Sequence, residues 1–427
     1  MVKPSVCTTI PTASNQLFLT RRGSGNRSSY LIAQRRKAKN RAKLYLFFDI
    51  CKFFMKKSNF FVYFPKKHYF CTANRPHYMK KTTRLFLFVS LLLASCQPVK
   101  HPVLLSDTAQ YFTIAKDSAI TILKVFQPES NALMAQYAFN KPYERIAVTS
   151  ATHIGFLQAL GRTDVVVAMT RPDLIYNHPE QPVADIGEDI NLNLEELFRV
   201  HPQALLVTSY GQPLPNLERI RRAGIEVIEM VEWREQTPLA RADWLRFAGA
   251  LIGEEARADS LIITIREHYH DLAQQQDNYI QLPTSIMSGA AFRGIWYVPS
   301  GGTYMGRLFW DAKAAYAYYE DMRPNSIPLT FETALHTFGD ADVWVGCNCR
   351  NYEELLALDE HHAWFNAYKN KRVYNWYKMT TEAGANDFWE RGITHPDEIL
   401  EDIITILHNK HVSPDELHYA APLYELD

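Results

Sequence analysis

Side chains able to bind a large, partly apolar ligand gather at or just after the predicted strands of this 427-residue chain. In open parallel sheets, ligands bind beyond the carboxyl ends of the strands. Ligand pockets combine aromatic and apolar walls with a few polar groups, and the residue types found here suit that combination. The sequence therefore predicts a binding cleft lined by Ser150, His153, Tyr210, Trp233, Arg241, Trp296, Ser300, Tyr304, Trp376, Asn386 and Trp389.

Three parts of this set allow a second interpretation. The run from Ser300 to Thr303 contains two glycines and precedes a helix, so it could cradle a phosphate, but it lacks the spacing of a P-loop or a dinucleotide fingerprint. Arg241 could pair with an anionic ligand, or it could be a helix-start arginine held by neighbouring acids. His153 could ligate a metal or haem, although a single histidine at a helix start is more often a structural residue.

Other chemistry has weaker support in the sequence. The Cys347-x-Cys349 pair could bind a soft metal, but two semi-buried cysteines at a strand end are the more frequent meaning of such a pair. No G-x-S-x-G or H-E-x-x-H motif is present, although a catalytic triad can assemble from distant residues. We therefore expect a binding protein rather than an enzyme, with no resident metal.

Charge is distributed unevenly along the chain. Residues 1–78 hold 16 Lys and Arg and one acid, whereas residues 97–427 hold 27 Lys and Arg against 45 Asp and Glu. Nucleic-acid binding needs a basic face that displaces counterions, so the acidic body argues against it.

A lipoprotein export signal begins inside the chain, at Met79. Basic residues are followed by an apolar run over 85–93, too short to span a bilayer, and then by Leu93-Ala94-Ser95-Cys96, which matches a bacterial lipobox. We predict a signal peptide over 79–95 and a lipid on Cys96, the only covalent group expected. Residues 1–78 then lie upstream of the true start, and we expect them to be disordered or absent from the mature protein; otherwise they would form a basic arm.

The rest of the chain alternates strand and helix patterns in two similar halves. Continuous apolar strands separated by helices indicate parallel sheets that are covered on both faces. We expect an α/β fold of two Rossmann-like lobes with parallel-type sheets, joined by a long interlobe helix. The predicted bounds are a tether at 97–109, an N-terminal lobe at 110–238, the interlobe helix at 239–278, a C-terminal lobe at 279–411 and a tail at 412–427.

Individual elements follow from periodicity and capping residues. In the first half we expect a hairpin over 111–125, strands at 145–148, 165–168, 204–207 and 227–230, and helices at 152–160, 194–200 and 217–223. In the second half we expect strands at 285–287, 295–298, 343–346 and 373–376, and helices at 304–317, 331–338 and 396–408. The proline-free apolar pattern from Ala240 to Gln276 allows two long helices or one long bent helix.

Several segments resemble one family, the periplasmic binding proteins of the iron-chelate/cobalamin type, and within it a lipoprotein branch. They are Ser150-Ala151-Thr152-His153, the run from Glu232 to Trp244, and the run from Gly384 to Glu390. The run from Pro299 to Met305 is similar to the Pro-Gly-Gly-Ser-Tyr-Met segment of that branch. The likeness covers about residues 110–411 and is most specific around Arg241.

The resemblance implies a monomer that binds a metal chelate between its lobes, closes only slightly and delivers its cargo to an ABC permease and ATPase. A siderophore, haem or corrinoid is the implied cargo, and the lipid would hold the protein at the membrane, facing the periplasm. Relatives dock through one surface acid on each lobe, for which Glu195 and Glu332 are the candidates here. Two other hypotheses stay open: a lipoprotein that binds a bare metal ion, and an exported α/β hydrolase.

Overall fold

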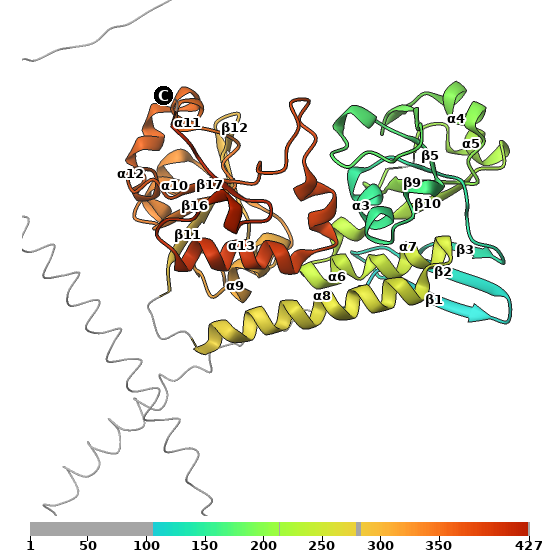
Figure 1. Cartoon of the computed structure of the whole chain (residues 1–427), viewed down its shortest axis with the longest axis horizontal. Helices are drawn as coiled ribbons and strands as arrows, with labels where there is room; N and C mark the ends of the chain where they lie inside the picture. Colours follow the sequence, from blue (N-terminus) through green and yellow to red (C-terminus); the bar gives the residue numbers. More distant parts are fainter. Residues whose placement is uncertain (1–105, 213, 279–282, 426–427) are drawn as a thin grey trace, which may run out of the picture. The chain divides into compact units, whose positions relative to one another are not determined.

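The computed structural model describes residues 106–212, 214–278 and 283–425 (Figure 1). The predicted export signal and Cys96 lie outside these residues. The described chain forms two α/β lobes, each with helices packed around a mainly parallel sheet, and a helical segment connects them. The predicted α/β fold class is confirmed.

The sheet of the first lobe, called the N-lobe, is parallel throughout, with strand order β10-β9-β4-β5-β6. The chain starts at β4 and adds strands on both sides of it, so the loops that leave neighbouring strands diverge there, which favours ligand binding. The strands are β4 (Ile146–Val148), β5 (Val166–Met169), β6 (Ala184–Asp185), β9 (Ala204–Thr208) and β10 (Glu226–Met230), and the helices are α3 (Ala151–Ala159), α4 (Leu194–Val200) and α5 (Leu217–Arg222).

The sheet of the second lobe, called the C-lobe, has strand order β14-β11-β16-β17-β18. Strand β11 is flanked by β14 and β16, so the order reverses beside β11, and only β18 runs antiparallel. The strands are β11 (Ser285–Ser288), β14 (Ala315–Tyr316), β16 (Val343–Val345), β17 (Val373–Asn375) and β18 (Ala421–Pro422), and the helices are α9 (Tyr304–Asp311), α10 (Phe331–Phe338), α11 (Tyr352–Leu358), α12 (Asn366–Lys369) and α13 (Pro396–His408).

Two predicted elements of the C-lobe are wrong in part. The strand over 295–298 forms as β13 (Ile295–Val298), but it belongs to a separate antiparallel sheet with β12 (Ala291–Phe292) and β15 (Ile327–Leu329). Arg293 and Gly294 both have positive φ, 51° and 79°, and such a two-residue turn folds a strand back on itself. The helix predicted over 304–317 ends at Asp311, because Lys313 takes a left-handed φ of 58° and the chain then enters β14.

The predicted hairpin near the start of the fold gains a third strand that periodicity did not reveal. Strands β1 (Phe112–Asp117), β2 (Ile120–Phe126) and β3 (Leu133–Phe139) form an antiparallel sheet. The Phe112 ring contacts the rings of Trp244 and Phe247, with centroids 5.0 and 5.5 Å away, so this sheet packs on the connecting helices.

The connection between the lobes is three helices instead of the single interlobe helix predicted over 239–278. They are α6 (Pro238–Ala242), α7 (Trp244–Ile252) and α8 (Glu255–Gln275), and α8 is the long one. Helix α7 ends at Gly253, whose φ is 76° and whose place for a Cβ lies 2.8 Å from the Pro142 side chain. Glycine is the residue that accepts such a conformation and such a close approach.

Residues 106–109, the described end of the predicted tether, are hydrogen-bonded to the folded domain. The Thr237 hydroxyl donates to the Ser106 carbonyl (2.8 Å), and the Ala109 N–H donates to the Asp243 carboxylate (3.1 Å). Next along the chain, one oxygen of the buried Glu235 accepts N–H groups from Gln110 (2.9 Å), Tyr111 (3.1 Å) and the Trp244 indole (3.2 Å). Two buried acids therefore fix the entry of the chain to the interlobe junction.

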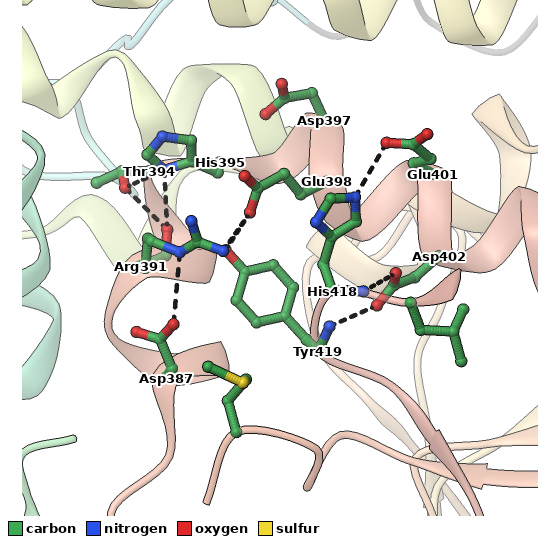
Figure 2. A network of polar contacts seen from close by, with 12 residues as sticks. Asp387, Arg391, Thr394, His395, Asp397, Glu398, Glu401, Asp402, His418 and Tyr419 are labelled. Carbon is green, nitrogen blue, oxygen red and sulfur yellow. Dashed lines mark hydrogen bonds and ion pairs between the residues drawn. The ribbon is translucent and has the colours of Figure 1, made fainter. Parts of the chain in front are cut away.

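The prediction of a tail over 412–427 is wrong for its described part, because residues 412–425 complete the C-lobe. Strand β18 forms the antiparallel edge of the sheet, and Leu417, Tyr419 and Leu423 are buried. The buried Asp402 carboxylate of α13 accepts the backbone N–H groups of His418 (2.6 Å), Tyr419 (2.8 Å) and Ala420 (2.8 Å). Figure 2 shows the first two of these contacts. The sequence does not reveal this packing, because the partners of the segment are remote along the chain.

The Asp402 contact predicts a large stability effect. Replacing Asp402 with Ala leaves three N–H groups without their carboxylate acceptor, so we expect D402A to lower the free energy of unfolding by about 3 kcal/mol in urea titrations. Asp415, an exposed residue of the same C-terminal region, serves as the control, and D415A should change it by less than about 0.5 kcal/mol. Equal stability of the two variants would contradict the role given to Asp402.

Glu235 predicts a pH effect on stability. Burial raises its pKa from an ordinary 4.5 to about 7. Between these values the folded protein holds a proton that the unfolded chain has released, so this group makes stability fall as the pH rises from about 4.5 to about 7. In E235Q the amide oxygen can still accept the three N–H groups. We expect E235Q to lose up to about 3 kcal/mol of the pH dependence, measured by urea unfolding at pH 5 and pH 7.

The control for this measurement is Glu382→Gln, at an exposed position of the C-lobe. If E235Q and E382Q keep the same pH dependence as the natural chain, then Glu235 does not bind a proton on folding.

Candidate ligand-binding site

A chain of polar side chains lies at the carboxyl ends of β4 and β10 in the N-lobe. Ser150 caps α3 by accepting the Thr152 N–H (3.3 Å), and its hydroxyl lies 2.9 Å from the Thr152 hydroxyl. Thr152 donates in turn to the Glu232 carboxylate (2.9 Å). Glu232 is buried, its second oxygen has no hydrogen-bond partner in the described structure, and burial raises its pKa. The half-buried Ser150 thus connects the surface to an incompletely satisfied carboxyl group.

Two aromatic rings lie together beyond neighbouring strands of the same lobe. Tyr210 follows β9 and Trp233 follows β10, and their ring centroids are 5.8 Å apart. Tyr210 is 60% exposed and Trp233 is 37% exposed, while the Trp233 indole N–H donates to the Ser209 carbonyl (3.2 Å). The pair forms an apolar surface beyond β9 and the edge strand β10, open to a ligand with a flat or apolar face.

Arg241 holds the backbone behind this pair. Its guanidinium donates to the carbonyls of Glu235 (3.0 Å) and Trp233 (2.7 Å), and it lies over the Tyr304 ring of the C-lobe at 4.6 Å. Burial lowers the pKa of the guanidinium. The Arg241 donors thus reach two carbonyls and an aromatic ring, while the neighbouring Glu232 and Glu235 act on the guanidinium through their charge. Pairing of Arg241 with a ligand anion stays a prediction. We conclude that Arg241 fixes the position of Trp233 and joins the lobes.

The C-lobe contributes aromatic side chains after β17. Trp376 stacks on Phe388, with centroids 4.9 Å apart and an interplanar angle of 18°, and only 9% of Trp376 is exposed. The Asn386 amide donates to the Trp376 carbonyl (2.9 Å) and caps the 3₁₀ turn η6 (Asp387–Trp389). Trp389 contacts Phe388 edge-on at 4.7 Å and is 60% exposed. Of these residues, Trp389 presents the open surface and the others hold it.

Six of the residues predicted to contact a ligand are buried: Tyr304 and Trp376, whose contacts are given above, and the four that follow. His153 is inside α3, where burial lowers its pKa to about 3 and keeps the ring neutral. Trp296 is in the C-lobe core, 5.3 Å from the Trp344 ring, and the Ser300 hydroxyl bonds to the Arg323 carbonyl. Asn386 is buried as well, with its amide committed to Trp376. These four side chains are therefore covered in this conformation, and their contact with a ligand stays a prediction.

Sequence reasoning missed the exposed residues beside Trp296. Along β13 exposed and buried residues alternate, so that Ile295 and Tyr297 face outward while Trp296 and Val298 face the core. Phe292 pairs with Ile295 across the hairpin and is exposed too. The four residues of β13, Ile-Trp-Tyr-Val, are all apolar or aromatic, so the sequence leaves open which face of the strand is buried. Glu232 was also missed, because a single acid has no spacing signal.

Several remaining features of the described residues concern other ligands. A hollow of about 330 Å³ lies at the end of β5, lined by Met169 and Pro172 and by residues 178–183, none of which was predicted as a site residue. Cys347 and Cys349 are buried free thiols, and burial raises the pKa of Cys349 to about 11. In the described ranges, no three His, Cys, Asp or Glu side chains come close enough to hold a metal ion.

The two candidate docking acids lie at helix starts of opposite lobes. Glu195 is in the first turn of α4 and Glu332 is in the first turn of α10, and both are exposed. Docking through them stays a prediction. Among the helices that the structure describes, none has both the length and the apolar character required to cross a membrane.

Two α/β lobes with exposed aromatic rings beyond their parallel strands define a solute-binding protein. A sequence profile described as periplasmic binding protein matches residues 146–379. The chain therefore belongs to the periplasmic binding protein family, as the motifs of the sequence predicted.

Two relatives and one solved structure resemble this chain, and the solved structure shares its fold. An uncharacterized lipoprotein of Methanocaldococcus jannaschii is 21% identical over 296 residues, which are 66% of this chain and 69% of that protein. A second uncharacterized lipoprotein of the same organism is 22% identical over 203 residues, or 46% of this chain and 52% of that protein. The crystal structure of a periplasmic binding protein from Veillonella parvula matches with a TM-score of 0.50 at 10% identity, covering 67% of this chain and 97% of that one.

Proposed function

We propose that this protein is the substrate-binding lipoprotein of an ABC importer and that it captures a ferric siderophore, haem or a corrinoid between its lobes. The observation that carries the proposal is the pair of exposed aromatic surfaces beyond the parallel strands, Tyr210 with Trp233 on the N-lobe and Trp389 on the C-lobe. Aromatic faces stack well on flat macrocycles and on the apolar parts of large chelates. Ligand sites of open α/β sheets form at this end of the strands.

The polar groups of the candidate site suit a ligand whose polar part is neutral or carries several hydrogen-bond donors. The Ser150 hydroxyl is half-buried and is linked through Thr152 to the Glu232 carboxyl group. Such groups accept and donate hydrogen bonds and would orient the ligand, while the rings supply most of the contact area. Arg241 holds the Trp233 backbone and would keep this surface rigid.

Delivery and anchoring complete the proposal. Cys96 would carry the lipid that holds the protein at the membrane, facing the periplasm, and the two lipoprotein relatives support this placement. The monomer would deliver its cargo to a permease and ATPase complex, with Glu195 and Glu332 as the proposed docking acids, since both are exposed.

The test is a fluorescence-quenching titration of the purified chain with haemin, cyanocobalamin and a panel of ferric siderophores. Trp233 and Trp389 are exposed in the candidate site, so a bound chelate should quench them. We expect saturable quenching by one compound with a Kd below about 1 μM, or better than about −8 kcal/mol. Absence of binding by every compound contradicts the proposal and leaves the bare-metal and hydrolase hypotheses, which metal titration and esterase assays then separate.

Single substitutions locate the binding surface. We expect W233A and W389A each to raise the Kd of the bound chelate by about tenfold or more, because each removes a large stacking surface. Trp364, which is 53% exposed and packs against His361 and Phe331 instead, is the matched control, and W364A should leave the Kd unchanged. A normal Kd in both W233A and W389A would place the ligand elsewhere on the protein.

A further inference from the structure

One segment of the C-lobe is bound to the N-lobe along most of its length. It runs from Asn386 to Ile393 and contains η6 and the second 3₁₀ turn η7 (Arg391–Ile393); we call it the bridging segment. In Figure 1 it lies between the two lobes, and η6 and η7 pack against α3 of the N-lobe. Sequence reasoning assigned Asn386 and Trp389 of this segment to ligand contact, whereas most of its side chains are buried.

Glu390 is the main polar link across the lobes. It is buried, and its carboxylate accepts the backbone N–H groups of Tyr176 and of Asn177 (3.2 Å) and the side-chain amide of Gln158 (3.3 Å). All three donors belong to the N-lobe. A buried carboxylate without such donors is costly, so Glu390 favours the lobe arrangement that supplies them.

Asp387 makes a second link beside the first. It is buried, and it accepts a hydrogen bond from the Asn177 side-chain amide (2.7 Å). Asn177 therefore bonds to the bridging segment twice, through its backbone to Glu390 and through its side chain to Asp387. Both contacts disappear if the lobes move apart by more than about an ångström, because hydrogen bonds weaken steeply with distance.

The backbones of the two lobes also touch directly. A Cβ placed on Gly155 of α3 would lie only 2.2 Å from the Glu390 carbonyl oxygen. Glycine is required at this position because any side chain would push the bridging segment off the helix. The contact is thus close-packed in addition to being hydrogen-bonded.

On its other side the bridging segment is tied to the C-lobe core. Arg391 pairs with Glu398 (2.9 Å), and the Tyr419 hydroxyl donates to the same carboxylate (2.6 Å). Figure 2 shows how Arg391, Glu398 and Tyr419 meet, with Asp387 on the far side of the arginine. Phe388 stacks on Trp376. Movement of the segment relative to the N-lobe would therefore move Trp376 and Trp389 with it.

We propose that the bridging segment is a clamp between the lobes, in which Glu390 and Asp387 are positioning residues that hold Trp389 at a set distance from the N-lobe rings. The inference rests on the proposed function, since it names residues that control the affinity of that site without touching the ligand. The clamp holds the ligand-binding surfaces of the two lobes in a fixed relative position before the ligand binds. Less conformational entropy is then lost on binding.

The test exchanges the hydrogen-bonding partners Asn177 and Asp387. In N177D two carboxylates face each other across the lobes, so we expect the bound probe to dissociate about tenfold faster. The probe is haemin, cyanocobalamin or a ferric siderophore, whichever binds the natural chain, and rates are measured by stopped-flow fluorescence on the full chain. The double variant N177D/D387N restores a donor opposite an acceptor, and we expect its rate to return close to the natural value. N325D adds the same charge on an exposed C-lobe loop and should change nothing.

A second readout needs no ligand. The backbone N–H groups of Tyr176 and Asn177 donate to Glu390, so their hydrogen exchange reports the clamp directly. We expect faster exchange of these two amides in N177D, recovery in N177D/D387N and no change in N325D. Exchange and dissociation that both stay at the natural rates in N177D would overturn the clamp.

The two proposals fail in different ways. If exchange accelerates in N177D while the dissociation rate stays the same, the clamp joins the lobes but does not position the site, and the inference is wrong. If the natural chain binds none of the probes, the proposed function is contradicted, while the exchange measurement still decides whether the lobes are held in this way.

Discussion

Buried carboxylates that accept backbone N–H groups join parts of this fold that are remote in sequence. Glu235 accepts hydrogen bonds from the start of the described chain, and Glu390 accepts them from a loop of the opposite lobe. Asp402 accepts them from the C-terminal segment. Each acid is buried and satisfied by donors from another part of the protein. An unpaired carboxylate in such a place would cost several kcal/mol, so each of these contacts strongly favours one arrangement of its partners.

Buried acids also contribute to holding the two lobes at a fixed separation. Helices α6, α7 and α8 join the lobes covalently, and the bridging segment joins them a second time through Glu390 and Asp387. Arg241 adds a third contact by reaching from the Trp233 carbonyl to the Tyr304 ring. The exposed rings of the candidate site are therefore attached to backbone segments that contacts between the lobes hold in place. A pre-organised binding site requires such rigidity.

Residues of the same type differ widely in solvent exposure at the candidate site. Trp233 and Trp389 are exposed, whereas Trp296 and Trp376 are largely buried, although all four are tryptophans at or near strand ends. Neighbouring residues in one strand point to opposite faces, so an error of one position exchanges a core residue for a surface residue. The residues of β13 are all apolar or aromatic, so the identity of its buried face depends on what packs against it.

The sequence by itself determined the class of fold and the family. Apolar strands alternating with capped helices require sheets covered on both faces, and the segment from Glu232 to Trp244 carries a specific family pattern. Local geometry was predictable where local causes act, as at Asn193 and Thr330, which cap the starts of α4 and α10. The export signal and Cys96 were likewise predicted from local pattern, outside the residues that the structure describes.

The tertiary structure alone decided which of the candidate residues are exposed and which are buried or make contacts between the lobes. Glu390 and Asn177 are 213 positions apart, and no local pattern indicates that one will accept a hydrogen bond from the other. The C-terminal segment was predicted to be a tail because the partner of its β-strand and the carboxylate that binds it lie in distant elements. Burial and pairing are properties of the packed chain, so local spacing could nominate these residues but could not assign their roles.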